Sequence, residues 1–433
     1  MIDFTLTPSQ RELQQSTRTF AQTHLSTAPS LYSSHGDQRS RFESILPLYR
    51  RAVCSGLIKA QIPIPFGGTN ASLIDAAIQL EELYAVETSV SLTIFANGLG
   101  LTPLILAGSE EQRGKFLEPF LREDGEPLAS LMHSEPEGTA NWLEKGGKGL
   151  QTTARREDGG DGWVINGEKL WTTNSSGWDG KGADLQCVVC RYSPDGSPQD
   201  PSADPASSIL ILIVTREVIA QNPPTAYTIL SEPELAGHVA VTNPHTRFTN
   251  FRVPESHLLC PPGTGAAVVE QAFTSSAALV GAMAVGLMRA AFEAALKFAK
   301  EDSRGGANPI IYHQSVADLL MDMKMKADST RLVTWKALHC LQSSGPEVDF
   351  NARFEGCLQA KIFGSEAAVQ CVMDGMKVVG MTSYNKDQPF SRLLNDAICL
   401  PLFDGGNVGI RRRQMEKIFQ DEQYKPWVAT YGA

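Results

Sequence analysis

One apolar segment limits what this chain can fold into more than any other feature. The stretch from Ser275 to Lys300, SSAALVGAMAVGLMRAAFEAALKFAK, is apolar on nearly all sides until Arg289. A helix of that kind has to be buried among other helices. Gly281 and Gly286, set among many alanines, allow neighbouring helices to approach closely. The span from Ala277 to Met288 falls short of the roughly 20 apolar residues that cross a bilayer, so we expect a core helix and no membrane association.

The period of the hydrophobic pattern changes twice along the chain. Residues 1–127 carry apolar side chains at helical spacing, with Ser109 in an N-cap position. Residues 128–262 contain short apolar runs typical of strands, and Asn166-Gly167 predicts a tight hairpin between two of them. Residues 263–433 return to long helices, the last of them after Asn407. We therefore predict an α+β multidomain protein with an N-terminal α-helical domain, a central β-barrel-like domain and a C-terminal four-helix bundle.

Composition excludes several classes of function. The net charge of −10 argues against nucleic-acid binding, because neutralising phosphates requires clustered lysine and arginine. The one basic run, Arg411 to Arg413, is too short for a nucleic-acid groove. The eight cysteines are scattered, which fits a reducing compartment, and Cys187 and Cys190 lack a second pair at zinc spacing, so we expect no metal site. The N-terminal segment lacks the layout of a signal peptide, and we expect a cytoplasmic protein.

Three segments carry the residues that are candidates for binding and catalysis. A glycine-rich phosphate loop is not found, since Gly98-Leu99-Gly100 lacks the third glycine, and no G-x-S-x-G hydrolase motif occurs. The three segments are SLMHSEPEGTAN (130–141), GEKLWTTN (167–174) and PLFDGGNVGIRRRQ (401–414). In the third segment Arg411 follows Asp404 by two helical turns, so its guanidinium can face that carboxylate and keep it ionised, as a general base requires. Asp404 as a simple helix N-cap is the alternative.

The domain order and these three segments, in register, resemble the acyl-CoA dehydrogenase superfamily over essentially the whole chain. The resemblance implies a non-covalently bound FAD and a homotetramer. It places Leu131, His133 and Ser134, together with Trp171 and Thr173, around the flavin ring. It assigns Arg304 and Gln314 to the pyrophosphate and adenosine half of the cofactor, often that of a neighbouring subunit, and implies close backbone approach to the cofactor at Gly375, Gly380, Gly405 and Gly406.

Three of these assignments have a simpler alternative. The segment around His133 could be a polar loop that orders itself, because turn-type polar residues are common in loops. Trp171 could be an ordinary core residue, since a large aromatic side chain is usually buried. Arg304 could be a surface arginine, although its planar, permanently charged fork suits a phosphate.

Departures from the superfamily pattern point to one branch of it. Asp404 replaces the family's glutamate base, Gly406 replaces a threonine, and Ser134 replaces the threonine of the signature. These departures match the nitroalkane-oxidising branch. The resemblance then implies that Asp404 removes the α-proton of a neutral nitroalkane and that Arg411 holds the carboxylate of Asp404. It also implies that Ser276, at the opening of the buried helix, forms a hydrogen bond near the flavin. The alternative is that Ser276 is merely a small helix residue.

The expected reaction uses oxygen as the acceptor and yields an aldehyde or ketone, nitrite and hydrogen peroxide. An acyl-CoA dehydrogenase or oxidase acting on a short or branched acyl-CoA is the main alternative, and it needs a channel for the pantetheine arm. A flavin-bound scaffold without turnover and a flavin monooxygenase without a carboxylate base are further alternatives.

Overall fold

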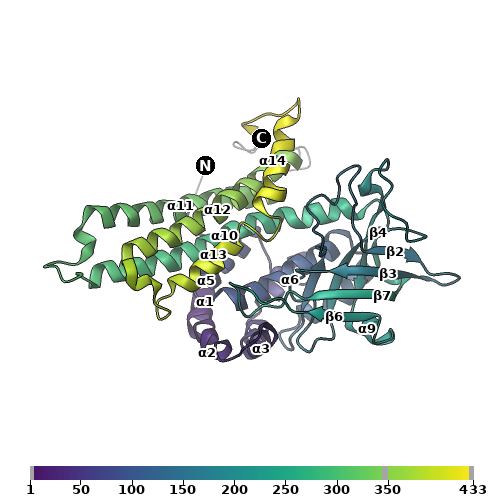
Figure 1. Ribbon diagram of the computed structural model, residues 1–433, viewed down its shortest axis with the longest axis horizontal. Helices are drawn as coiled ribbons and strands as arrows, with labels where there is room; N and C mark the ends of the chain where they lie inside the picture. The colour runs from purple at the N-terminus through teal and green to yellow at the C-terminus, as the bar shows by residue number, and fades with distance from the viewer. Residues whose placement is uncertain (1–3, 344–349, 429–433) are drawn as a thin grey trace.

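The computed structural model describes residues 4–343 and 350–428. Figure 1 shows an elongated molecule with a β-sheet at one end, a bundle of long helices at the other, and a group of N-terminal helices beside them. The predicted succession of helices, strands and helices is confirmed. The N-terminal helices are α1 (Pro8–Thr23), α2 (Ala28–Tyr32), α3 (Gln38–Ser44), α4 (Leu46–Cys54), α5 (Leu73–Tyr84), α6 (Thr88–Ala107), α7 (Glu110–Phe116) and α8 (Glu118–Leu121).

The central part forms one mixed sheet. Its strands run in the order β6-β7-β3-β2-β4-β5-β8, and β1 pairs with β4. The pairs β1·β4 and β2·β4 are parallel, and the others are antiparallel. The strands are β1 (Ala129–Met132), β2 (Thr153–Arg156), β3 (Gly162–Lys169), β4 (Leu185–Tyr192), β5 (Ile209–Val214), β6 (Tyr227–Ser231), β7 (His245–Pro254) and β8 (Leu258–Cys260), and the short helix α9 (Arg216–Gln221) follows β5.

The prediction of a hairpin at Asn166-Gly167 is wrong. Strand β3 continues through both residues, with an irregularity in its pairing with β7 between Ile165 and Gly167, and the tight connection lies earlier, between β2 and β3. Gly167 is needed for another reason, because it has a φ of +139° and a Cβ there would lie 2.5 Å from the Cα of Thr152. The glycine therefore allows close backbone approach at an irregular position in a strand.

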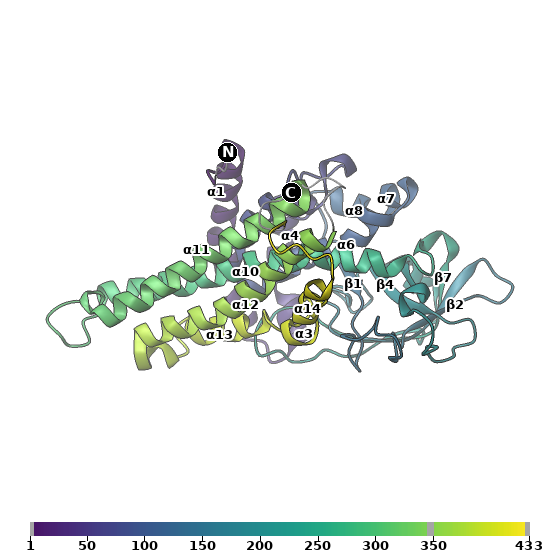
Figure 2. The same cartoon turned by 90° about the horizontal axis from the view of Figure 1, so that it is seen from above.

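The bundle consists of α10 (Gly265–Glu301), α11 (Gln314–Ser343), α12 (Phe350–Val379) and α13 (Phe390–Cys399). The expectation that the fourth helix follows Asn407 is wrong, since α13 packs against α10 and α12, whereas α14 (Arg412–Gln420) covers one end of α12. An apolar contact of Ile418 with Phe354 and Leu358 holds α14 there. Figures 1 and 2 show α10 running from the sheet to the far end of the bundle.

Two helices of the described residues, α6 and α10, are long and apolar enough to span a membrane by length and composition alone. The most apolar windows of these helices are 56% and 61% buried, α6 against β1 and α10 against α11 and α12. The predicted helix from Ser275 to Lys300 is confirmed, and it begins ten residues earlier, at Gly265. Arg289 is tolerated because it pairs with carboxylates of α5.

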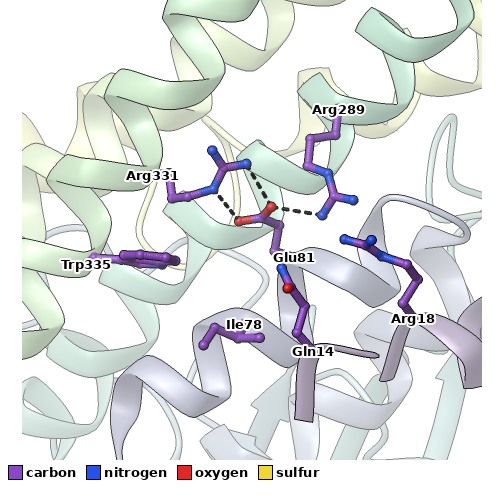
Figure 3. Close-up of a pocket in the computed structure, with 7 residues that line it drawn as sticks. All are labelled: Gln14, Arg18, Ile78, Glu81, Arg289, Arg331 and Trp335. Atoms are coloured by element: carbon purple, nitrogen blue, oxygen red, sulfur yellow. Dashed lines mark hydrogen bonds and ion pairs between the residues drawn. The ribbon is translucent and has the colours of Figure 1, made fainter. Parts of the chain in front are cut away.

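A network of charged side chains joins the N-terminal helices to the bundle. Glu81 accepts hydrogen bonds from Arg289 (2.8 Å) and from Arg331 (2.8 and 2.9 Å), as Figure 3 shows. The neighbouring Glu82 binds Arg18 at 2.9 Å and also Arg289. The adjoining cavity of about 210 Å³ is lined by these charges, but each arginine is already paired with a carboxylate. The network therefore fixes how the helices dock and leaves no spare charge for a ligand.

Replacement of Gly167 by alanine should destabilise the fold, because the new Cβ meets backbone and the φ of +139° disfavours a side chain. The loss should be roughly 1–3 kcal/mol, the range for backbone strain and overpacking. Gly114→Ala is the matched control, since Gly114 is exposed in α7 and a Cβ there meets nothing within 4 Å. The control should be neutral or stabilising by up to about 1 kcal/mol. Thermal unfolding compares the two, and equal midpoints would contradict this reading of Gly167.

Candidate active site

The carboxylate of Asp404 lies buried between a helix and a turn. The hydroxyl of Ser276 donates a hydrogen bond of 2.6 Å to Oδ1, and Nη2 of Arg411 lies 3.4 Å from Oδ2. The side chains of Asp404 and Arg411 are 5% and 2% exposed. The structure thus brings the three predicted catalytic residues into direct contact. The N-cap alternative is wrong, because Gly406 occupies the cap of the following π-helical turn, Asn407–Arg411, and that turn has no side-chain cap.

Arg411 binds the backbone of Asp404 more closely than it binds the carboxylate. Its Nε and Nη2 donate to the carbonyl oxygen of Asp404 at 3.0 and 2.6 Å, and Nη2 also reaches the carbonyl of Phe273 at 3.4 Å. Burial lowers the pKa of the Arg411 guanidinium, while the charge of Asp404 opposes that shift. Arg411 therefore fixes the backbone that carries Asp404 and places a positive charge beside its carboxylate.

Ser276 does not open the buried helix as expected, because α10 begins at Gly265 and Ser276 lies well inside it. The hydroxyl also approaches the carbonyl of Phe273, one helical turn earlier, at 3.4 Å. It is therefore held on the face of α10 that meets Asp404. The alternative that Ser276 is merely a small helix residue is wrong, given its 2.6 Å bond to the carboxylate.

The glycines after Asp404 face protein groups. Gly405 has a φ of +75°, and a Cβ there would lie 2.6 Å from Nε of Arg411 and 2.8 Å from its Cζ. At Gly406 a Cβ would lie 3.2 Å from the carbonyl oxygen of Leu402. Gly405 therefore makes room for the guanidinium of Arg411, and the close approach of both glycines to the cofactor stays a prediction.

The predicted flavin loop lies beside this cluster. Leu131 is buried in β1, and the ring of His133 lies between those of Trp142 (4.7 Å) and Phe273 (5.6 Å). Burial lowers the pKa of His133 to about 3, so the ring is neutral, and its Nε2 is buried without a hydrogen-bond partner. Ser134 joins this loop to the next one, because its carbonyl oxygen accepts the backbone N–H of Leu170 at 2.9 Å.

The loop after β3 has a strained backbone. Trp171 and Asn174 have φ values of +64° and +70°, in a region that residues other than glycine rarely adopt. Trp171 is 52% exposed, so the core alternative for this residue is wrong. The hydroxyl of Thr173 donates to Oδ1 of Asn243 at 2.7 Å, and the buried Oδ1 of Asn174 has no partner. Strain of this kind persists where a site requires it.

These two loops suit a flat, polar cofactor. Trp171 offers an exposed apolar wall, and two buried polar atoms, Nε2 of His133 and Oδ1 of Asn174, have no protein partner. Buried polar groups are normally satisfied, so the two atoms fit a ligand that supplies hydrogen bonds. Phe273 connects the loop of His133 to Arg411, whose Cζ lies 5.8 Å from the Phe273 ring centroid. Phe273 and Trp142 were missed by the sequence analysis, and no local pattern distinguishes either from a core aromatic residue.

The other predicted cofactor residues gather at the far end of the bundle. Arg304, with a φ of +51°, donates to Thr382 at 3.0 Å and to the carbonyl of Val379, and its Cζ lies 4.5 Å from the ring centroid of Phe298. Gly380 ends α12 with a φ of +69°, and a Cβ there would lie 3.9 Å from Arg304. Gln314 is the exposed first residue of α11.

Gly375 has a packing role within the bundle. It is buried in the middle of α12, and a Cβ there would lie 2.8 Å from the ring of Phe390 and 3.1 Å from Met323. The glycine therefore allows α13 and α11 to pack against α12, and the approach of its backbone to the cofactor stays a prediction.

The two ends of the predicted cofactor site are far apart within one chain. Ser276 and Glu301 belong to the same continuous helix, and 25 residues at 1.5 Å per residue place them about 38 Å apart. That separation exceeds the length of an extended flavin dinucleotide. One chain therefore cannot bring Asp404 and Arg304 to the same cofactor.

Comparison with known proteins agrees with this architecture. Residues 7–124 match the family model of the acyl-CoA dehydrogenase N-terminal domain, and residues 263–418 match that of the C-terminal domain. The two models flank the sheet and include the buried carboxylate. Fold and site together define a flavoprotein of the acyl-CoA dehydrogenase type.

Relatives within that class are closely similar over their full length. The chain is 58% identical to nitroalkane oxidase of Fusarium oxysporum, with 100% of this chain and 98% of the relative aligned. It is 50% identical to nitroalkane oxidase of Podospora anserina, with 100% and 99% aligned. A solved structure of nitroalkane oxidase in complex with spermine, a competitive inhibitor, superposes over 100% of both chains at a TM-score of 0.97 and 57% identity. The chain belongs to the nitroalkane oxidase family.

Replacement of Gly405 by alanine should displace the guanidinium of Arg411, because the added methyl overlaps its Nε and Cζ. We expect a lower melting temperature and weaker flavin retention, because Arg411 then loses its hydrogen bonds to the carbonyl oxygen of Asp404. Gly409→Ala is the control, because its Cβ meets only Ala140 at 3.9 Å. Flavin absorbance after gel filtration and thermal unfolding measure both variants. Equal behaviour of the two would mean that Gly405 is not required for the position of Arg411.

Proposed function

We propose that this protein is an FAD-dependent oxidase that converts neutral primary or secondary nitroalkanes and oxygen into aldehydes or ketones, nitrite and hydrogen peroxide. The observation that carries the proposal is the buried carboxylate of Asp404, held by Ser276 and Arg411 in a chain 58% identical to a nitroalkane oxidase. A structural neighbour with 57% identity is an active-site mutant of nitroalkane oxidase crystallised with 1-nitrooctane.

The arrangement suits abstraction of a proton from carbon. Oδ2 of Asp404 is free to accept the α-proton, because Oδ1 is occupied by the hydroxyl of Ser276 and the Arg411 contact to Oδ2 is long, at 3.4 Å. The positive charge of Arg411 favours the ionised carboxylate before transfer and the nitronate anion after it. Asp404 loses this proton again before the next turnover.

The flavin, when bound, supplies the two-electron acceptor and passes the electrons to oxygen. Trp171 and the loop of His133 would hold its ring, and the neutral imidazole of His133 would offer a hydrogen bond without a charge. The reaction balances as one nitroalkane, one oxygen and one water giving one carbonyl compound, one nitrous acid and one hydrogen peroxide.

Asp404→Asn should keep the fold and the flavin, because the amide is nearly isosteric with the carboxylate. The rate of flavin reduction by neutral nitroethane should fall about 10²–10⁴-fold, which is what general-base catalysis typically contributes. Preformed ethyl nitronate needs no proton transfer, so its rate should fall far less. Stopped-flow flavin bleaching with both substrate forms makes the measurement.

Equal loss with both forms would show that Asp404 is not the base. A wild-type enzyme that leaves nitroethane untouched and bleaches with a short acyl-CoA would favour the acyl-CoA dehydrogenase alternative. Bleaching by nitroethane with release of nitrite and peroxide excludes a flavin scaffold without turnover.

We infer further that the enzyme is an oligomer, with a homotetramer expected, in which the Arg304 end of one subunit completes the FAD site of another. The separation of about 38 Å along α10 supports this sharing. Large apolar side chains on the outer faces of α11 and α12 support it too, because monomers rarely expose so many on one bundle. These exposed side chains are Met321, Met325, Leu332, Phe363 and Met373.

Mixed oligomers test the sharing directly. Arg304→Ala and Asp404→Asn should each give a weakly active enzyme, the first because FAD is lost on dialysis. Co-expressed under two affinity tags, they should recover activity, because an intact Asp404 site then receives Arg304 from the other subunit. If purified mixed oligomers recover no activity, the FAD site is not shared between subunits. A wild-type protein that sediments as a monomer with FAD bound would also contradict a shared site.

A further inference from the structure

A buried lysine lies behind the segment that carries Asp404. Lys361 belongs to α12 and is fully buried. Its ammonium donates to the carbonyl oxygen of Leu400 and, at 3.1 Å, to Oδ1 of Asn407. Leu400 and Asn407 are the two ends of the turn on which Asp404 lies. One side chain of the bundle therefore fastens both ends of that turn.

The same lysine is part of a longer anchor. The side-chain amide of Asn407, held by Lys361, donates in turn to Ser365 at 3.0 Å and to Glu366 at 3.1 Å, both on α12. The Lys361 ammonium also lies 5.8 Å from the ring centroid of Phe403, the residue before Asp404. The turn is thus tied to α12 through polar groups, and its conformation depends on them.

The charge of Lys361 has no direct partner. The other fully buried lysine, Lys169, forms an ion pair of 2.9 Å with Glu135, whereas Lys361 forms no ion pair within residues 4–343 and 350–428. A buried, unpaired ammonium is unfavourable unless neighbouring groups compensate. Both of its hydrogen bonds go to neutral oxygens.

Four ionisable groups act on Lys361 from the elements around it. The carboxylate of Asp404 attracts it most, Arg411 repels it, and the thiol of Cys399 on α13 and Glu366 on α12 contribute less. Burial raises the pKa of Cys399 to about 11, so this thiol is neutral, and Glu366 is engaged with Arg412 at 2.8 Å. Burial lowers the pKa of Lys361 to about 8, which leaves the ammonium charged at neutral pH. Asp404 is therefore the anion that compensates it.

We propose that Lys361 is a positioning residue for the base, Asp404. Lys361 fastens the turn from Leu400 to Asn407 to the bundle, and its ammonium adds a second buried positive charge to that of Arg411. The inference rests on the proposed nitroalkane oxidation. A purely structural lysine would fix the turn without influencing the ionisation of the carboxylate, and this difference can be measured.

The test compares Lys361→Met and Lys361→Gln with the wild-type holoenzyme. Both variants remove the charge, and glutamine keeps a hydrogen-bond donor. The acid limb of the pH profile of kcat/KM for neutral nitroethane should move up by about 1 pH unit in both, the lower end of what a nearby opposite charge contributes. On that limb, kcat/KM should fall about tenfold at a given pH. Lys297→Met, an exposed lysine on α10, is the matched control and should leave the profile unchanged.

The possible outcomes are distinct. An acid limb in the wild-type position in both variants, with nitroethane still oxidised, overturns the inference and leaves the proposed function intact. A wild type that does not oxidise nitroethane overturns the proposed function itself. Should neither variant retain flavin, Asn407→Ala gives the test, because it removes an acceptor and leaves the ammonium in place. Its pH-independent kcat/KM should fall by roughly tenfold or more through misplacement of the turn, and an unchanged value overturns the inference.

Discussion

Helix α10 runs without a break for 37 residues, and its close packing fixes the distance between the two halves of the molecule. A Cβ at Gly281 would lie 2.2 Å from the hydroxyl oxygen of Thr334, and one at Gly286 would lie 2.7 Å from Cβ of Tyr84. α11 and α5 therefore contact its backbone directly, and Arg289 adds ion pairs to α5. A rod held in this way cannot tilt without breaking several contacts, so the hydroxyl that it presents to Asp404 is fixed by the whole bundle.

The charges behind the base follow a different rule from those that dock the helices. At the docking contact three arginines meet three carboxylates, those of Glu81, Glu82 and Asp328, and the network is balanced and partly exposed. The carboxylate of Asp404 is instead accompanied by two buried cations, Arg411 and Lys361. Lys361 bonds only carbonyl and amide oxygens, and the shortest hydrogen bonds of Arg411 go to the carbonyl oxygen of Asp404. An excess of buried positive charge is unfavourable for folding, and in the proposed reaction it stabilises the anion that the substrate becomes.

Periodicity predicted most of the fold because helices and strands bury one face each, and that pattern is local. The errors arose where distant residues decide. Asn166-Gly167 has the local signature of a hairpin, yet Gly167 is required by Thr152 on the neighbouring chain segment. The packing role of Gly375 was likewise hidden from the sequence, because the residues that require a glycine there, Phe390 and Met323, belong to other helices. Asp404 could be found from its motif, whereas Lys361 lies some 40 positions earlier in a helix and has no signature in the sequence.

The exchange of glutamate for aspartate at the base is tied to the backbone beneath it. Asp404 has a φ of +53°, a region that aspartate and asparagine tolerate because their short polar side chains bond locally, and that longer side chains adopt less readily. The following Gly405 is also left-handed, and its missing Cβ leaves the space that the guanidinium of Arg411 fills. Arg411 in turn binds the carbonyl of Asp404, which stabilises the unusual φ. A glutamate here would need a different turn, because its additional methylene would carry the carboxylate away from Ser276 and the fixed guanidinium. Asp404, Gly405 and Arg411 therefore form one structural unit, and a change in any of them changes the position of the carboxylate that we propose as the proton acceptor.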